Sequence, residues 1–161
     1  MSAELTVVPL NREREAPECA QMMLATEPWI TLGLPLNVAL SLLSDSAREV
    51  YAIRDPTGVA GFVVLDMRGL VAGYIQILCV RADRRGQGVG STLIRWSEER
   101  IFKDSPNAFI CVSSFNADAR RLYERLGFDR AGVLTNFIVP GHDEFLLRKT
   151  RGSWKEFRAT E

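Results

Sequence analysis

Three glycines within five residues, Gly86, Gly88 and Gly90, constrain the fold of this 161-residue chain more than any other feature. A β-rich apolar run, Val71 to Val80, precedes them, and apolar residues recur at helical spacing over 93–101. A strand that turns through glycines into a helix lets a ligand approach the main chain closely. The first helical amides lack internal partners and carry the positive end of the macrodipole. The turn is therefore predicted to bind a phosphate or diphosphate group.

The residues around this turn separate it from two other phosphate-binding motifs. The phosphate loop of nucleoside triphosphatases needs a lysine after its last glycine, but Gly90 is followed by Ser91 and Thr92. The dinucleotide fingerprint needs a third glycine at position 91 and an opening βαβ unit, and the chain offers neither. A dinucleotide-binding domain and a purely structural turn stay as alternatives. Arg84 or Arg85 could add positive charge at the rim.

The other apolar patterns predict a mixed domain, classed as α/β or α+β, in which one sheet carries helices on its faces. Strands are expected over 5–10, 50–53, 60–67, 71–80, 108–112, 131–139 and 144–149, and helices over 14–25, 36–43, from the glycine turn onward, and from an Asn116 cap to a left-handed Gly127. No repeat or linker interrupts this order. We therefore expect a single domain over 1–161, with a core from about 4 to 150 and a C-terminal tail over 151–161.

Composition narrows the class of protein without defining its chemistry. Twenty basic and twenty acidic residues cancel, so no whole-molecule field favours nucleic acid. The N-terminal stretch resembles neither a signal peptide nor a membrane span, which predicts a cytoplasmic protein without a membrane partner. The three cysteines, Cys19, Cys79 and Cys111, are widely spaced, and His142 is the single histidine. We expect free thiols and no metal site.

Two segments together resemble the GCN5-related N-acetyltransferases (GNAT). The run Arg85, Gly86, Gln87, Gly88, Val89, Gly90 matches the Q/R-x-x-G-x-G/A signature of that family, and the stretch from Asn116 to Phe128 is similar to its second signature. The resemblance implies a GNAT-like fold. In that fold a central mixed, mostly antiparallel sheet is splayed between its fourth and fifth strands and is flanked by about four helices, with acetyl-CoA in the gap.

The resemblance also implies the contacts of the co-substrate. Main-chain groups of the fourth strand would pair with the pantetheine arm, the glycine turn would hold the pyrophosphate, and Asn116 would contact the cofactor from the other wall. The cofactor-binding residues implied in this way are Leu78, Cys79, Val80, Arg85, Gly86, Gln87, Gly88, Val89, Gly90, Ser91, Asn116 and Tyr123.

Tyr123 corresponds to the tyrosine that serves relatives as general acid toward the departing thiolate, a role its pKa near 10 allows. Gln76 and Cys111 stand where relatives carry a glutamate base, so Glu27 is our candidate base. His142 and Glu144, near the last hairpin, could also reach the acceptor but are not selected.

The predicted activity is acetyl transfer from a coenzyme A thioester to a primary amine by direct attack. The acceptor would be a small amine, a lysine or a protein N-terminus, and the segment Asn136 to Leu147 is loosely similar to the last hairpin of ribosomal-protein N-terminal acetyltransferases. A catalytically weak acyl-CoA-binding sensor is the alternative. Dimers are common in the family, so a homodimer is allowed.

Overall fold

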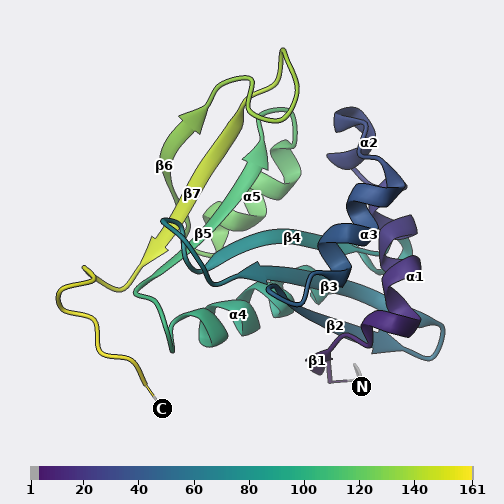
Figure 1. Ribbon diagram of the computed structural model, residues 1–161, viewed down its shortest axis with the longest axis horizontal. Coiled ribbons are helices and arrows are strands. Elements are labelled where there is room, and N and C mark those ends of the chain that lie inside the picture. Colours follow the sequence, from purple (N-terminus) through teal and green to yellow (C-terminus); the bar gives the residue numbers. More distant parts are fainter. Residues whose placement is uncertain (1–3, 161) are drawn as a thin grey trace. The chain divides into compact units, whose positions relative to one another are not determined.

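The computed structural model describes residues 4–160 and has a mixed α/β architecture (Figure 1). Within this range the chain forms a seven-stranded, mostly antiparallel sheet and five α-helices, where about four helices were expected. The elements follow in the order β1 (Val7–Pro9), α1 (Arg12–Leu24), α2 (Trp29–Leu32), α3 (Leu36–Ser44), β2 (Glu49–Asp55), β3 (Gly58–Asp66), β4 (Tyr74–Val80), the 3-10 helix η1 (Ala82–Arg84), α4 (Val89–Ile101), β5 (Asn107–Ser113), α5 (Ala117–Arg125), β6 (Asp129–Leu134) and β7 (Glu144–Thr150).

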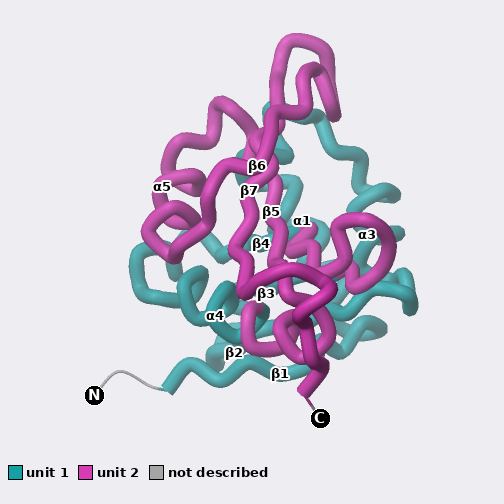
Figure 2. The backbone as a smooth tube through the Cα atoms, turned by 90° about the vertical axis from the view of Figure 1, so that its left-hand side faces the viewer, with its two compact units in different colours: residues 1–65, 77–97 teal, residues 66–76, 98–161 magenta. Residues whose placement is uncertain are grey.

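The strand order is β1-β2-β3-β4-β5-β7-β6, and β4 and β5 form a parallel pair. The chain divides into two compact units that alternate along the sequence (Figure 2). The first unit comprises the residues up to 65 and 77–97, and the second comprises 66–76 and the residues from 98 onward. Strand β4 contributes its first residues to the second unit and its last residues to the first. The prediction of one domain over 1–161 stays a prediction.

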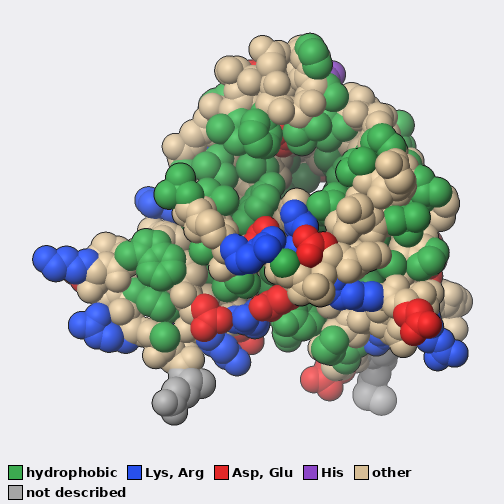
Figure 3. Space-filling model, in the orientation of Figure 1, with side chains coloured by type: hydrophobic (Ala, Val, Ile, Leu, Met, Phe, Trp, Pro, Cys, Tyr) green, Lys and Arg blue, Asp and Glu red, His purple; other side chains and the backbone are tan. Residues whose placement is uncertain are grey.

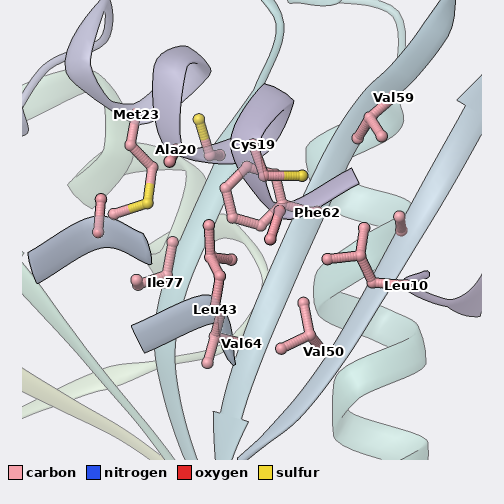
Figure 4. Packing of buried hydrophobic residues seen from close by; sticks show 14 residues of the cluster. Leu10, Cys19, Ala20, Met23, Leu43, Val50, Val59, Phe62, Val64 and Ile77 are labelled. Atoms are coloured by element: carbon pink, nitrogen blue, oxygen red, sulfur yellow. The ribbon is translucent and has the colours of Figure 1, made fainter. Parts of the chain in front are cut away.

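The first unit buries its apolar side chains between two helices, α1 and α3, and the strands β2, β3 and β4. Figure 4 shows this cluster from close by, with Met23 and Leu43 from the helices facing Phe62 and Ile77 from the strands. Seven consecutive residues of β3, 59–65, are buried, so both faces of this strand are covered. Such a strand reads as a continuous apolar run instead of an alternating one.

Gly61 in β3 lets helix α4 approach the sheet closely. A Cβ at this position would lie 2.7 Å from Cγ1 of Val89 and 3.1 Å from the carbonyl oxygen of Cys79, closer than real Cβ atoms are normally found. Val89 is the first residue of α4 and is itself buried. The absence of a side chain in β3 therefore fixes where the N-terminus of α4 sits in the first unit.

The second unit is held together by β5, β6 and β7 and by helix α5. The Asn116 side chain caps α5 by accepting a hydrogen bond from the Ala119 amide at 3.4 Å, and Gly127 adopts a φ of 95° after the helix, as expected. Lys149 donates to the Leu126 carbonyl at 2.9 Å and pairs with Glu98 at 2.6 Å. These contacts anchor both ends of α5.

Several boundaries and one short helix differ from the sequence expectation. Strand β6 ends at Leu134 and not at 139, because Asn136 takes a positive φ of 49° and the loop after it is closed by internal hydrogen bonds. The Asn136 amide donates to the Asp143 side chain, and the Gly141 amide donates to the Asn136 side chain. The short helix α2 lies between the two expected N-terminal helices, where no element was predicted. Helix α1 begins at Arg12, since Asn11 is its cap. No helix within 4–160 has the length and apolarity needed to cross a membrane.

Candidate active site

The glycine turn lies at the N-terminus of the 13-residue helix α4 in the first unit. Gly86 and Gly88 adopt φ values of 71° and 84°, a region in which residues with a Cβ are strained. A Cβ on Gly86 would meet no atom within 4 Å, so the main chain is open to a ligand there. The Thr92 amide donates to the Gly88 carbonyl at 3.0 Å, and the amides before it precede the first helical bond. The turn thus has the geometry of an anion site.

Asp55, at the end of β2, anchors this turn to the β2–β3 hairpin. Its carboxylate accepts hydrogen bonds from Arg81 and from Arg84, both at 2.6 Å, and from Thr57. These hydrogen bonds, that of Thr57 first, hold the pKa of Asp55 far below its usual range. Nothing local in the sequence indicates that two arginines 26 and 29 residues later reach Asp55.

The two rim arginines are therefore not equivalent. Arg84 is occupied by Asp55, whereas Arg85 is exposed and makes only long contacts, 3.4 Å to the Val80 carbonyl and 3.3 Å to the Thr26 hydroxyl. Long contacts are easily exchanged for a better partner. Of the pair, Arg85 is the one placed to add charge to an anion on the turn.

The other residues of the first unit that are predicted to bind acetyl-CoA lie at the end of β4. The parallel ladder with β5 joins Tyr74 to Phe109 and Ile75 to Ile110, so Leu78, Cys79 and Val80 lie beyond it along the strand. Leu78 and Val80 are half-buried, and the Cys79 side chain points into the apolar cluster. Cys79 can therefore offer a ligand only its main chain.

None of the three thiols is set up as a nucleophile. Burial raises the pKa of Cys79 to about 12 and also raises the pKa values of Cys19 and Cys111. Only the thiolate form of cysteine attacks efficiently, and thiols of this kind are protonated at neutral pH. The structure therefore offers no activated cysteine for a covalent acetyl-enzyme.

Asn116 and Tyr123 belong to the second unit, at the start and in the last turns of α5. The cap uses the Oδ1 acceptor of Asn116 and leaves the NH2 donor out of that bond. Tyr123 is only 6% exposed and packs edge-on against Phe128 with ring centroids 6.5 Å apart. Its ring is thus fixed in one orientation, as a proton donor requires.

A set of polar side chains shares one face of the second unit. Ser113 lies opposite Glu144 where β5 ends and β7 begins, and its hydroxyl donates to the Glu144 carboxylate at 2.5 Å. Two residues back along β5, Cys111 lies on the same face, as does Tyr74 of β4. The sequence alone does not single out Glu144, because the register that pairs these strands cannot be inferred from any one of them.

Glu27, the predicted base, follows α1 in the first unit. Its carboxylate is exposed and accepts two hydrogen bonds from Thr31, at 3.1 Å from the amide and 2.8 Å from the hydroxyl. Thr31 lies in α2, so the Glu27 carboxylate accepts a hydrogen bond from an amide that has no partner within that short helix. This is a complete structural role, and it does not require the carboxylate to meet a substrate.

An open helix N-terminus after a glycine turn, on a mixed sheet with a parallel β4–β5 pair, defines a class of protein that holds a phosphorylated ligand at its main chain. Residues 13–128 match the Acetyltransferase (GNAT) family, a span that includes the glycine turn and all of α5. The chain belongs to this family and is an acetyltransferase of it. The predicted family, fold and enzyme class are confirmed.

Individual relatives agree with this assignment. The acetyltransferase Atu2258 of Agrobacterium fabrum is 34% identical over 124 residues, which cover 62% of this chain and 88% of the relative. Two solved structures match at lower identity and therefore inform on the fold alone. One is the ribosomal-protein-S18-alanine N-acetyltransferase of Escherichia coli (TM-score 0.75, 17% identity, 98% and 100% of the two chains), and the other is an aminoglycoside 6'-N-acetyltransferase complexed with coenzyme A (TM-score 0.72, 14% identity, 91% and 97%).

Proposed function

We propose that this protein transfers an acetyl group from acetyl-CoA to a primary amine by direct attack. The observation that carries the proposal is the open glycine turn at the start of α4, inside the segment that matches the family. Bound acetyl-CoA supplies a thioester carbonyl to the reaction. The amides of 86–91 would hold its diphosphate, with Arg85 as the additional charge, and the main chain of 78–80 would orient the pantetheine arm.

Tyr123 acts in this proposal as the general acid. Its hydroxyl donates a proton to the departing sulfur as the new C–N bond forms, which prevents the thiolate from attacking in reverse. Support comes from its position, since Tyr123 lies in the part of α5 that matches the family and is clamped against Phe128. Direct attack is supported by the three protonated thiols, which leave no cysteine to carry the acetyl group.

The experiment is an acetyl-CoA turnover assay with a panel of amines, followed by release of free thiol. The wild-type protein should release thiol with at least one amine, and Tyr123→Phe should lower kcat about 10²- to 10⁴-fold while acetyl-CoA affinity changes little. Phe128→Leu is a useful second variant, because it loosens the tyrosine ring without removing the hydroxyl. Its effect on kcat should therefore be smaller than that of Tyr123→Phe.

Two results would contradict the proposal. Tight binding of acetyl-CoA without turnover of any amine would instead favour the sensor function. Equal kcat in wild type and Tyr123→Phe would remove Tyr123 from the mechanism. The acceptor panel should contain small amines, lysine peptides and peptides with free N-termini. The reason is that structures of an aminoglycoside acetyltransferase and of a ribosomal-protein N-acetyltransferase match this fold almost equally well.

A further inference from the structure

A carboxylate in the second unit is buried without a cation. Glu144 is 3% exposed, and its carboxylate accepts a hydrogen bond from the Ser113 hydroxyl at 2.5 Å. Within residues 4–160, no Lys or Arg forms an ion pair with it. Buried carboxylates in proteins are normally paired with a cation or coordinate a metal, because an unpaired buried charge is costly. No group of side chains that could hold a metal is found in the described part of the chain. The arrangement of Glu144 thus needs another explanation.

The register of three strands shows which side chains share a face with Glu144. Side chains alternate along a strand, and paired residues lie on the same face. Phe109 pairs with Tyr74 in β4, and Ser113 pairs with Glu144 in β7. The face that contains Glu144 therefore consists of Tyr74 and Gln76 from β4, Phe109, Cys111 and Ser113 from β5, and Leu146 and Arg148 from β7.

The cations of this region lie elsewhere. Arg120 and Arg130 stack on the ring of Phe145, which points to the opposite face because it neighbours Glu144 along the strand. Arg148 is on the Glu144 face but four residues along β7, and it is exposed. Gln76 cannot accept a proton at neutral pH. Within this face, Glu144 is the one carboxylate.

The buried surroundings of Glu144 favour its protonated form. Burial raises the pKa of Glu144, and the Ser113 hydrogen bond opposes this rise only in part. Glu144 in turn contributes, after burial and the Cys111 interactions, to raising the pKa of Tyr74, and Tyr123 contributes as well. Glu144 and Tyr123, the proposed general acid, thus both lie close enough to the Tyr74 hydroxyl to influence its pKa. A carboxylate with a raised pKa is a stronger base than an ordinary one.

We propose that Glu144 is the general base that deprotonates the acceptor ammonium. The proposal rests on the acetyl-transfer function proposed above. In the step, one N–H bond of the ammonium breaks and an O–H bond forms on Glu144, so that a neutral amine and a neutral carboxylic acid result. The amine then attacks the acetyl carbon, the C–S bond breaks, and Tyr123 protonates the sulfur, while the attacking nitrogen releases its second proton to solvent to give the neutral amide. Glu144 returns its proton to solvent, and Tyr123 takes one up.

This assignment places the base in β7 and not at Glu27. Glu27 is exposed and accepts two hydrogen bonds from Thr31, so water and a helix cap already satisfy it. Glu144 has the opposite environment, with little water and a single hydroxyl donor. An ammonium group that approaches this face would supply the missing positive charge, which is the state in which proton transfer begins.

The test compares Glu144→Gln with two matched variants, Glu27→Gln and Glu99→Gln, in the wild-type background and with the best amine of the panel. Glu99 is an exposed carboxylate of α4, so Glu99→Gln should leave kcat/KM unchanged. Glu144→Gln should lower kcat/KM at pH 7 about 10²- to 10⁴-fold, the usual contribution of a general base. The deficit should shrink as the pH approaches the pKa of the amine, because more amine then arrives neutral.

A second acceptor makes the test independent of folding. A fluorinated analogue of the same amine has a lower ammonium pKa and is largely neutral at pH 7, so Glu144→Gln should affect its acetylation at least tenfold less. A purely structural defect would reduce both acceptors alike, and that result would overturn the proposal. A pH- and amine-dependent loss in Glu27→Gln instead of Glu144→Gln would overturn it as well.

The role of Ser113 can be resolved with the neighbouring serine as control. Ser113→Ala should shift the acidic limb of the kcat/KM profile to higher pH, because it removes the hydrogen bond that lowers the pKa of Glu144. Ser114→Ala should leave the limb in place, and an unshifted limb in Ser113→Ala would contradict the assignment. Failure of the proposed function gives a different pattern: the wild type would show no amine-dependent thiol release at any pH, which would also refute a base role for Glu144.

Discussion

The glycine turn of the first unit and the Glu144 face of the second differ in how they are built. The turn is a contiguous stretch, and its ligand groups are main-chain amides held by the conformations of Gly86 and Gly88. The face draws its side chains from β4, β5 and β7, and its outermost members, Tyr74 and Arg148, are 74 residues apart in the sequence. A site made of amides is a local property of the chain, whereas a site made of side chains across strands exists only once the register is set.

The two sites also differ in their response to pH. Main-chain amides do not titrate, so the affinity of the turn for a diphosphate should be nearly constant across neutral pH. The chemistry at Glu144 depends on a carboxylate whose pKa is raised by burial. We therefore expect acetyl-CoA binding and amine acetylation to separate in pH profiles of the same protein.

The largest expected effect on donor binding comes from the backbone of the turn. Gly88→Ala places a Cβ on a residue with a φ of 84°, a conformation that costs an L-residue roughly 1–2 kcal/mol. The turn must either bear this strain or change shape, and a changed shape misplaces the amides. Acetyl-CoA affinity, measured by calorimetry, should fall roughly 10-fold or more.

Gly132→Ala is the matched control for this prediction. Gly132 lies in β6, has no positive φ, and an added Cβ would meet no atom within 4 Å. Its substitution should leave acetyl-CoA affinity within about twofold of wild type, since ordinary surface changes stay within ±0.5 kcal/mol. If Gly88→Ala also bound acetyl-CoA normally, the conformation of Gly88 would not matter to the site.

The elements that could be predicted from the sequence are those with a local cause. Asn116 as the cap of α5, the left-handed Gly127 and the helix after the glycine turn all depend on neighbours within a few residues. Strand β6 was predicted too long because Phe137 and Ile138 suggest a strand, yet both side chains are exposed in a loop that Asn136 closes. The competing signal was one residue in a left-handed conformation.

In the candidate site, too, only the features with a local cause could be predicted from the sequence. The turn over 85–91 could be predicted as an anion site because its three glycines lie within five residues of the sequence. Neither the pairing of Asp55 with two arginines nor the burial of Glu144 has a local signal, since both depend on contacts 26 or more residues apart. Glu27 was selected as base on its place in the order of helices, and that selection stays a prediction; the local sequence does not show that its carboxylate accepts hydrogen bonds from Thr31.

A smaller effect should distinguish the two rim arginines of the turn. Arg85→Gln removes an exposed charge that has only long contacts, so acetyl-CoA affinity should fall roughly two- to fivefold at low salt, the range of an exposed ion pair. The loss should diminish at high salt because screening weakens the interaction in wild type as well. Arg84→Gln should have less effect on affinity, because Arg84 is paired with Asp55. The reverse order of the two effects would show that Arg84, and not Arg85, meets the ligand.

The smallest expected effect is on stability, and it tests whether Glu144 is held in an unfavourable state. Burial raises its pKa in the folded protein above the unfolded value, so the protonated form favours folding and this contribution is lost as the pH rises through the folded pKa. Glu144→Gln keeps a group that can accept from Ser113 but never ionises. At pH 7.5 it should therefore melt higher than wild type, on the order of a few degrees, and the gain should vanish near pH 4, where the wild-type carboxyl is protonated in both states. Glu99→Gln should show no such pH dependence. A lower melting temperature for Glu144→Gln at pH 7.5 would mean that the ionised carboxylate stabilises the second unit, which would contradict this prediction.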